Sequence, residues 1–275
     1  MTLSFKKWPS RLKRKLRELP LIEAIANRIS DRRFRAWQAN NPGGTFGDYY
    51  AAKTISHLEE GRSHYTLGQR GKAKDHKAQI DWTPDDFATR ALDIWEAILG
   101  FGLTARMNCV DYGCGSLRLG QHAMRYLEAG KYCGMDVVDT FINQGLELID
   151  PKLIADKSPL LLTITPDHLS QVAEWKPDFI FSSAVLQHVP PEELPEYFRR
   201  LASIMSGHCT AHIIYIAAPR MKRVKALNWV YPLDQILAAM AAGAPGLELI
   251  EDRALPTLGT VEGRKRRAIS IRASA

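Results

Sequence analysis

The sequence predicts an α/β protein with a doubly wound, mostly parallel β-sheet and a helical extension at its N-terminus. Three observations support this fold class. From residue 107 onward, short β-rich runs alternate with helical segments; the first strand runs directly into a glycine-containing turn; and the first 45 residues combine helical periodicity with an excess of basic residues. Strands that alternate with helices imply right-handed crossovers, which cover both faces of a parallel sheet.

Residues 1–45 are predicted to form a basic, amphipathic helical arm. Apolar residues recur at helical spacing in its first part, where the sequence places Trp8, Leu12, Leu16 and Leu19. Pro20 ends that pattern, and a second amphipathic helix is expected from Leu21 to about Trp37. The Asn-Asn-Pro-Gly-Gly run at 40–44 is a loop signal.

Residues 46–104 are predicted to form a helical cap and lid. A helix is expected over 48–60, and the polar, glycine-containing stretch 61–81 is interpreted as a loop. Thr83 and Pro84 have the pattern of an N-cap followed by a proline at the first helical position. That helix is expected to run to about Leu99 and to stop at Gly100 or Gly102.

Residues 105–275 are predicted to form one domain with seven strands. The strands are expected at 107–112, 131–135, 160–164, 178–182, 210–217, 247–251 and 267–271, and the helices at 117–129, 140–149, 191–205 and 232–242. Only a loop separates the last two strands, which predicts a closing antiparallel hairpin.

The amino-acid composition excludes several classes of protein. The chain has 275 residues, 45% hydrophobic and 24% charged, which excludes wholesale disorder, a fibre and a disulfide-based miniprotein. The net charge of +7 is uneven: residues 1–35 hold eleven basic and three acidic residues, so the arm carries +8 and the remainder −1. No apolar run approaches the ~20 residues of a membrane span, and none follows the basic start as in a secretory signal. We therefore expect a cytoplasmic protein.

The four cysteines form no CxxC pair. This pattern is typical of buried thiols in a reducing compartment and predicts no metal site.

The turn after the first strand is the main candidate for ligand binding. Gly113 and Gly115 at alternate positions allow a tight turn and let a ligand approach the backbone. Asp136 ends the next strand, 23 positions after Gly113, where an acid accepts hydrogen bonds from ribose hydroxyls. The third small residue of a dinucleotide site is replaced by Arg118, which disfavours NAD. Asp111 beside the turn fits a cofactor with a cationic sulfonium and ammonium better than a pyrophosphate.

These residues, together with the segment 179–189, resemble the motifs of class I S-adenosylmethionine-dependent methyltransferases. The variant DxGCGSLRxG resembles a bacterial subgroup associated with small-molecule or glycan modification. The resemblance implies a Rossmann-like fold and S-adenosylmethionine (SAM) as the cofactor. It places Asp111 near the methionine part of SAM and Asp136 at the ribose. The other implied contacts come from Gly113, Cys114, Gly115, Val137, Asp167 at the adenine, Ser182, Ser183, and Tyr65 and Gly68 over the cofactor.

Methyl transfer to a hydroxyl requires alignment, exclusion of water and removal of a proton. His188, which follows the fourth strand, is the candidate general base; alternatively, it caps the next helix or packs beneath the cofactor. The sequence has neither the [DNS]PP[YFW] segment of adenine N-methylation nor the Pro-Cys nucleophile of cytosine methylation after that strand. We therefore expect O-methylation of a small molecule or glycan hydroxyl. The alternatives are an RNA methyltransferase and a non-catalytic binding protein of the same fold.

Three interpretations of the basic arm stay open. Residues 1–35 could pack on the body with their charges in solvent, lie on the inner face of an anionic membrane, or contact RNA phosphates. Nucleic acid is the least favoured, because few aromatic residues lie among the basic ones.

Overall fold

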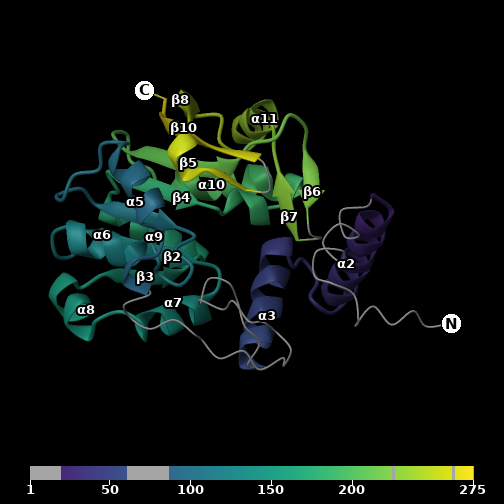
Figure 1. Cartoon of the computed structure of the whole chain (residues 1–275), viewed down its shortest axis with the longest axis horizontal. Coiled ribbons are helices and arrows are strands. Elements are labelled where there is room, and N and C mark those ends of the chain that lie inside the picture. Colours follow the sequence, from purple (N-terminus) through teal and green to yellow (C-terminus); the bar gives the residue numbers. More distant parts are fainter. Residues whose placement is uncertain (1–19, 61–86, 225–226, 262–263, 275) are drawn as a thin grey trace.

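The computed structural model describes residues 20–60, 87–224, 227–261 and 264–274 (Figure 1). A twisted sheet with strand order β3-β2-β1-β4-β5-β10-β8 forms its centre, and β9 pairs only with β10. The strands are β1 (Cys109–Tyr112), β2 (Tyr132–Asp136), β3 (Leu160–Thr163), β4 (Phe179–Ser183), β5 (Thr210–Ile216), β8 (Leu247–Ala254), β9 (Thr260–Val261) and β10 (Arg264–Ala273). The first five are parallel, and β10 runs antiparallel to both β5 and β8. The predicted doubly wound sheet with a closing hairpin is confirmed.

Helices cover both faces of this sheet because its central strands are apolar on both sides. Every residue of β1 and β2 is buried, as expected for inner strands of a parallel sheet. Val110 and Ile180 join one apolar cluster, whereas Phe179 and Phe181 join the other. The first cluster includes residues of α9 (Pro166–Trp175), α10 (Leu194–Ser203) and α11 (Leu233–Gly243), and the second includes residues of α5 (Leu92–Leu99), α6 (Gly120–Tyr126) and α7 (Asp139–Leu146).

Two helices between β2 and β4 were not predicted. They are α8 (Pro151–Lys157) and α9, and both begin with a proline at the first helical position behind a capping side chain. Thr165 accepts a hydrogen bond from the backbone N–H of His168 and so starts α9, in a segment where no helix was predicted. The predicted helix 117–129 is shorter in the structure, because Leu117 has a φ of 61° and leaves the helical region.

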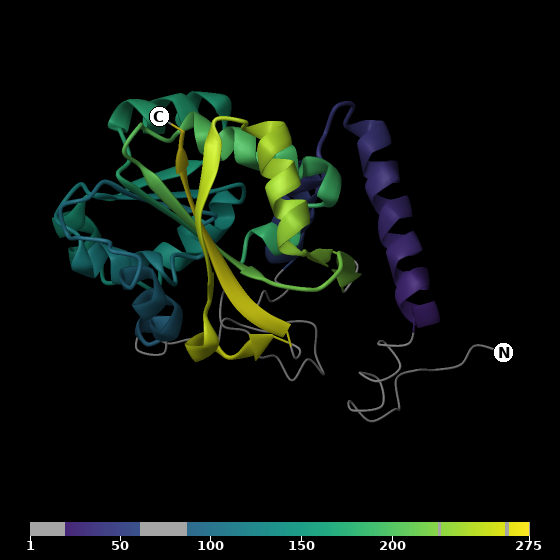
Figure 2. The ribbon, with the colours of Figure 1, turned by 90° about the horizontal axis from the view of Figure 1, so that it is seen from above.

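The N-terminal helices are α2 (Pro20–Asn40) and α3 (Phe46–Glu59), close to the predicted ranges. Residues 1–19 and the predicted N-cap at Thr83 lie outside the described residues. Figures 1 and 2 place α2 at the opposite end of the molecule from α6 and α8.

A small separate hairpin, β6 (Lys222–Val224) with β7 (Asn228–Val230), contacts α2. The Arg223 Nη1 atom lies 2.5 Å from Oδ1 of Asp31, and the guanidinium lies 5.1 Å from the ring centroid of Trp229. Phe46 packs edge-on against the same Trp229 ring. The hairpin therefore links α2 and the start of α3 to the α/β body. Short 3₁₀ helices occur at η3 (Leu186–His188), η4 (Pro191–Glu193) and η5 (Pro256–Leu258).

Candidate functional site

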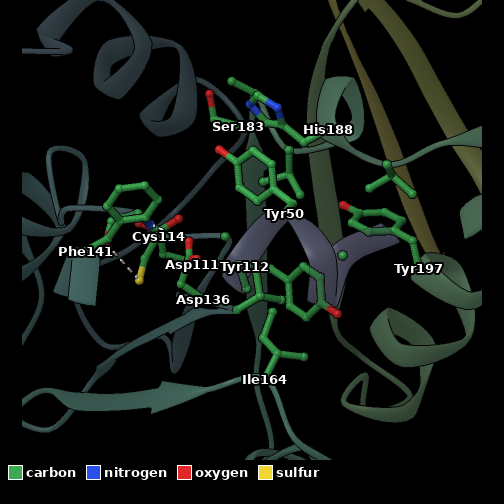
Figure 3. A pocket seen from close by; sticks show the side chains of 18 of the residues that line it. Tyr50, Asp111, Tyr112, Cys114, Asp136, Phe141, Ile164, Ser183, His188 and Tyr197 are labelled. Carbon is green, nitrogen blue, oxygen red and sulfur yellow. Dashed lines mark hydrogen bonds between the residues drawn. The ribbon is translucent and has the colours of Figure 1, made fainter. Parts of the chain in front are cut away.

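A cavity of about 360 Å³ opens at the carboxyl ends of β1, β2 and β4 (Figure 3). The chain passes from β1 to β2 and β3 on one side of β1, and the connection from β3 then crosses back to β4 on the other side. Open α/β sheets bind ligands at such a switch point. In Figure 3, Asp111, Asp136 and Phe141 group on one side of the cavity, and Tyr50 and His188 lie on another.

The turn at 113–115, called the glycine turn below, forms the floor of the cavity. Gly113 and Gly115 have φ values of 90° and 54°. The backbone N–H groups of Gly113 and Cys114 both donate to the carbonyl of Met135, at 2.7 and 2.9 Å. A Cβ atom at Gly113 would lie 2.2 Å from Cγ2 of Val185, whereas one at Gly115 would meet no atom within 4 Å. Gly113 is therefore required for packing, and Gly115 leaves backbone open to a ligand.

Asp136 fixes the end of β2 against the glycine turn. Its Oδ2 atom accepts from the N–H of Gly115 at 2.7 Å, and Oδ1 accepts from the N–H of Val138 at 2.9 Å. Burial raises the pKa of Asp136 to about 6, although these backbone hydrogen bonds oppose the shift. Each carboxylate oxygen keeps acceptor capacity for a further donor, such as a ribose hydroxyl.

Asp111 is a second buried acid on the same cavity. Burial raises the pKa of Asp111 to about 8, and the nearby charge of Asp136 raises it further. The hydroxyl of Tyr132, which donates to Oδ2 at 3.1 Å, and the charge of Arg118 both oppose this shift. A buried carboxyl with a raised pKa ionises more readily when a cation binds beside it. This site would therefore favour a positively charged ligand.

His188 lies in η3, directly after β4, and lines the cavity. Its Nδ1 atom is buried and has no hydrogen-bond partner within the described residues. Burial lowers the pKa of His188 to about 4, although a side-chain hydrogen bond with Asn228 opposes the shift, so the imidazole is neutral at neutral pH. The Nε2 atom lies 3.1 Å from the side-chain amide nitrogen of Gln187. The ring lies 5.1 Å from that of Tyr50, centroid to centroid. A neutral imidazole with an unpartnered nitrogen can exchange a hydrogen bond with a bound molecule.

The remaining side of the cavity comes from α3 and η4. The carboxylate of Glu193 accepts hydrogen bonds from the backbone N–H groups of Phe46 and Gly47, which holds the first turn of α3 beside the cavity. Six carboxyl groups and two guanidinium groups line the whole cavity, so its lining is acidic. One of these guanidinium groups, that of Arg200, pairs with Glu196 at 2.8 Å.

The structure brings most, but not all, of the predicted site residues together. The cavity is lined by Asp111, Gly113, Cys114, Gly115, Asp136, Val137, Ser183 and His188. Ser182 is buried instead beneath Tyr197, whose hydroxyl donates to Ser182 Oγ at 3.0 Å. The expectation that Asp167 meets the adenine finds no support in the geometry, because this residue is exposed in the first turn of α9 and does not line the cavity. Tyr65 and Gly68 lie outside the described residues.

The sequence did not single out Phe141 and Ile164, which line the cavity from α7 and from the end of β3. The position of Ile164 after a strand is a signal that could have identified it. Tyr50, which the sequence allows as part of the N-terminal cover, also lines the cavity, from α3. Ala184 also lines the cavity, with a φ of 62° that a residue with a side chain rarely adopts.

The described residues contain no group of three or more potential metal ligands. Among the described helices, none is both long and apolar enough to cross a bilayer.

Comparison with known proteins identifies the fold. No family model and no curated protein matches the chain. Among solved structures, magnesium protoporphyrin IX methyltransferase from Synechocystis PCC 6803 with bound SAH superposes with a TM-score of 0.53 at 13% identity, covering 83% of this chain and 98% of that one. A glycopeptide N-methyltransferase complexed with SAM gives 0.51 at 7% identity, covering 66% and 87%.

A [4+2]-cyclase also superposes, with a TM-score of 0.52 at 9% identity, covering 66% of this chain and 81% of that one. The chain therefore has the fold of the class I SAM-dependent methyltransferases. Because a cyclase shares this architecture, the reaction has to be argued from the site.

Proposed function

We propose that the protein is a SAM-dependent methyltransferase that modifies a hydroxyl group of a small molecule or glycan. The observation that carries the proposal is the pairing of two buried acids, Asp111 and Asp136, at the ends of adjacent strands on one cavity, beside the glycine turn. This donor set suits a ligand that combines a ribose with a positive charge. The SAM or SAH in the solved structures described above supports the same assignment.

The residues present fit SAM in charge and in shape. Asp136 would hold the ribose hydroxyls, and Asp111 would stabilise the cationic portion. Gly115 leaves space above the backbone that a side chain would fill. Val137, Phe141 and Ile164 provide apolar lining. SAM supplies an activated methyl group on a sulfonium.

The protein's own contribution to transfer is alignment, dehydration and proton removal. Tyr50 and Tyr197 close the cavity around the acceptor and exclude water. His188 is neutral at physiological pH. With the oxygen of the Gln187 side-chain amide turned toward Nε2, the imidazole carries its proton on Nε2 and offers the Nδ1 lone pair to an acceptor hydroxyl. We assign it the role of general base. Ser183 and Ala184 shape the cavity beside it.

The acidic lining disfavours RNA as the acceptor. Asp48, Glu192 and Glu196 line the cavity, where they would repel a phosphate backbone. A neutral or cationic acceptor suits the same lining.

Titration calorimetry of the full chain with SAM tests the cofactor assignment. We expect binding, with an affinity that falls at least about tenfold in Asp136→Asn, because the ribose would lose hydrogen bonds to a charged acceptor. Asp156→Asn, on exposed α8, is the matched control and should bind as the wild type does. Failure of the wild type to bind SAM, or unchanged affinity in Asp136→Asn, would reject the assignment.

A transfer screen with methyl-labelled SAM, against metabolites and glycans, tests the reaction. We expect His188→Gln to lower turnover by about 10²–10⁴-fold while SAM affinity stays close to that of the wild type. Binding of SAM without transfer to any acceptor would favour a non-methylating member of the fold, as the cyclase neighbour illustrates.

A further inference from the structure

The α2 helix presents two chemically different faces. Ser30, Phe34 and Trp37 face inward, where the aromatic rings pack with those of α3. The opposite side, here called the outward face, carries Ile25 and Ile29, which are 49% and 47% exposed. Exposed arginines flank these isoleucines at helical spacing, namely Arg28, Arg32, Arg33 and Arg35. Figure 2 shows α2 along one side of the molecule, with no other described element outside it.

The positive charge of the outward face is not neutralised within the described structure. The α2 helix contains four arginines and two acids, Glu23 and Asp31, and Asp31 pairs with Arg223 of β6. None of the four exposed arginines forms an ion pair with a described residue. The sequence before α2 adds seven basic residues and one acid over positions 1–19. The helix therefore combines exposed apolar side chains with unbalanced cationic charge.

We infer that the outward face of α2 docks on the surface of an anionic lipid bilayer. The arginines would contact the lipid headgroups, and Ile25 and Ile29 would enter the boundary with the acyl chains. Charge complementarity alone would also suit RNA, but the isoleucines have no role in contacting phosphates. Within α2, the aromatic rings of Phe34 and Trp37, which could stack on bases, are turned inward. Docking on an anionic bilayer accounts for both the exposed arginines and the exposed isoleucines of the outward face.

Co-sedimentation of the full chain with vesicles tests the inference. One vesicle set contains phosphatidylcholine with phosphatidylglycerol, and the other phosphatidylcholine alone. We expect binding to the anionic set and little to the neutral one. The triple variant R28Q/R32Q/R35Q should weaken partition by about fivefold per arginine. The pair I25S/I29S, which keeps every charge, should weaken it about tenfold.

Matched controls come from exposed residues on other elements. Ile250→Ser removes a side chain that is 48% exposed on β8, and R106Q/R199Q removes two exposed arginines. Both controls should partition as the wild type does. Circular dichroism melts of all variants establish that the α2 substitutions leave the fold intact.

Three results would overturn the inference. One is equal sedimentation with neutral and anionic vesicles. The second is unchanged binding of both α2 variants, which would assign any membrane affinity to residues 1–19. The third is tight binding of a single-stranded RNA oligonucleotide that weakens in R28Q/R32Q/R35Q but not in I25S/I29S, with no sedimentation on vesicles.

Discussion

Asp111 is the residue at which ligand binding and folding stability conflict. Its pKa is raised to about 8 in the fold from an ordinary value of 3.8, so its stabilising contribution is complete below about pH 4 and is lost as pH rises toward 8. Asp111→Asn does not titrate and keeps an oxygen for the hydroxyl of Tyr132. We expect the melting temperature of this variant to exceed that of the wild type by at least about 2 °C at pH 8, with a smaller gain at pH 5.

The same substitution should weaken SAM binding at both pH values, which is a trade-off common to functional sites. Thermal melts with and without SAM measure both effects. A variant that is less stable than the wild type at pH 8 would contradict the burial argument.

The two acids also predict how SAM affinity responds to pH. Ligand binding favours the ionised carboxylates, so it should lower the pKa values of Asp111 and Asp136 from about 8 and about 6. Protons are then released on binding near pH 7, and affinity rises between pH 6 and pH 8. Calorimetry in buffers of different ionisation enthalpy measures this release. Net proton uptake would contradict the assignment of these acids to a cationic ligand.

The glycine turn offers a matched pair of substitutions. Gly113→Ala has to displace Val185, whose Cγ2 atom would lie 2.2 Å from the new Cβ, at a φ of 90°. We expect this variant to lose more than about 2 kcal/mol of stability. Gly115→Ala meets no atom within 4 Å and should lose only about 1 kcal/mol, while still weakening SAM binding. Equal unfolding free energies for the two variants in urea would contradict this reading of the turn.

At the scale of elements, Arg223 of β6 joins the N-terminal helices to the body. It pairs with Asp31 of α2 and lies over the ring of Trp229 on β7. We expect Arg223→Ala to increase proteolytic cleavage in α2 and to cost about 1 kcal/mol of stability. A double-mutant cycle with Asp31→Asn should give a coupling energy of about 0.5–1 kcal/mol. Zero coupling would mean that the aromatic contacts alone hold α2.

The sequence predicted the sheet well because its inner strands are continuous apolar runs bounded by turns. It also identified the glycine turn and Asp136, whose spacing follows from one strand–helix–strand unit. The side of the cavity formed by α3 and η4, which we call the acceptor side, was harder to predict. Tyr50 and Glu193 meet there from segments separated by more than a hundred positions. Asp167 lies outside the cavity lining, on a helix that the cap at Thr165 starts shortly after β3.

On the scale of the whole molecule, charge is divided between two surfaces of opposite sign. The outward face of α2 is basic, and the lining of the cavity is acidic. Salt should therefore separate the two binding events. Raising NaCl from about 0.05 M to about 0.5 M shortens the Debye length severalfold, so vesicle binding should fall steeply while SAM affinity in the buried cavity changes little. Parallel sedimentation and calorimetry on one preparation measure this difference, and a parallel loss of both affinities would contradict it.

The link between Glu193 and the first turn of α3 has a consequence for how such a protein can diverge. The glycine turn and the acids of β1 and β2 belong to the sheet, whereas α3 is an added segment held by a few hydrogen bonds and aromatic contacts. Mutations in α3 or η4 can reshape the acceptor side without disturbing the residues that we assign to SAM. Descendants of one ancestral gene could thus acquire new acceptors while inheriting the same cofactor.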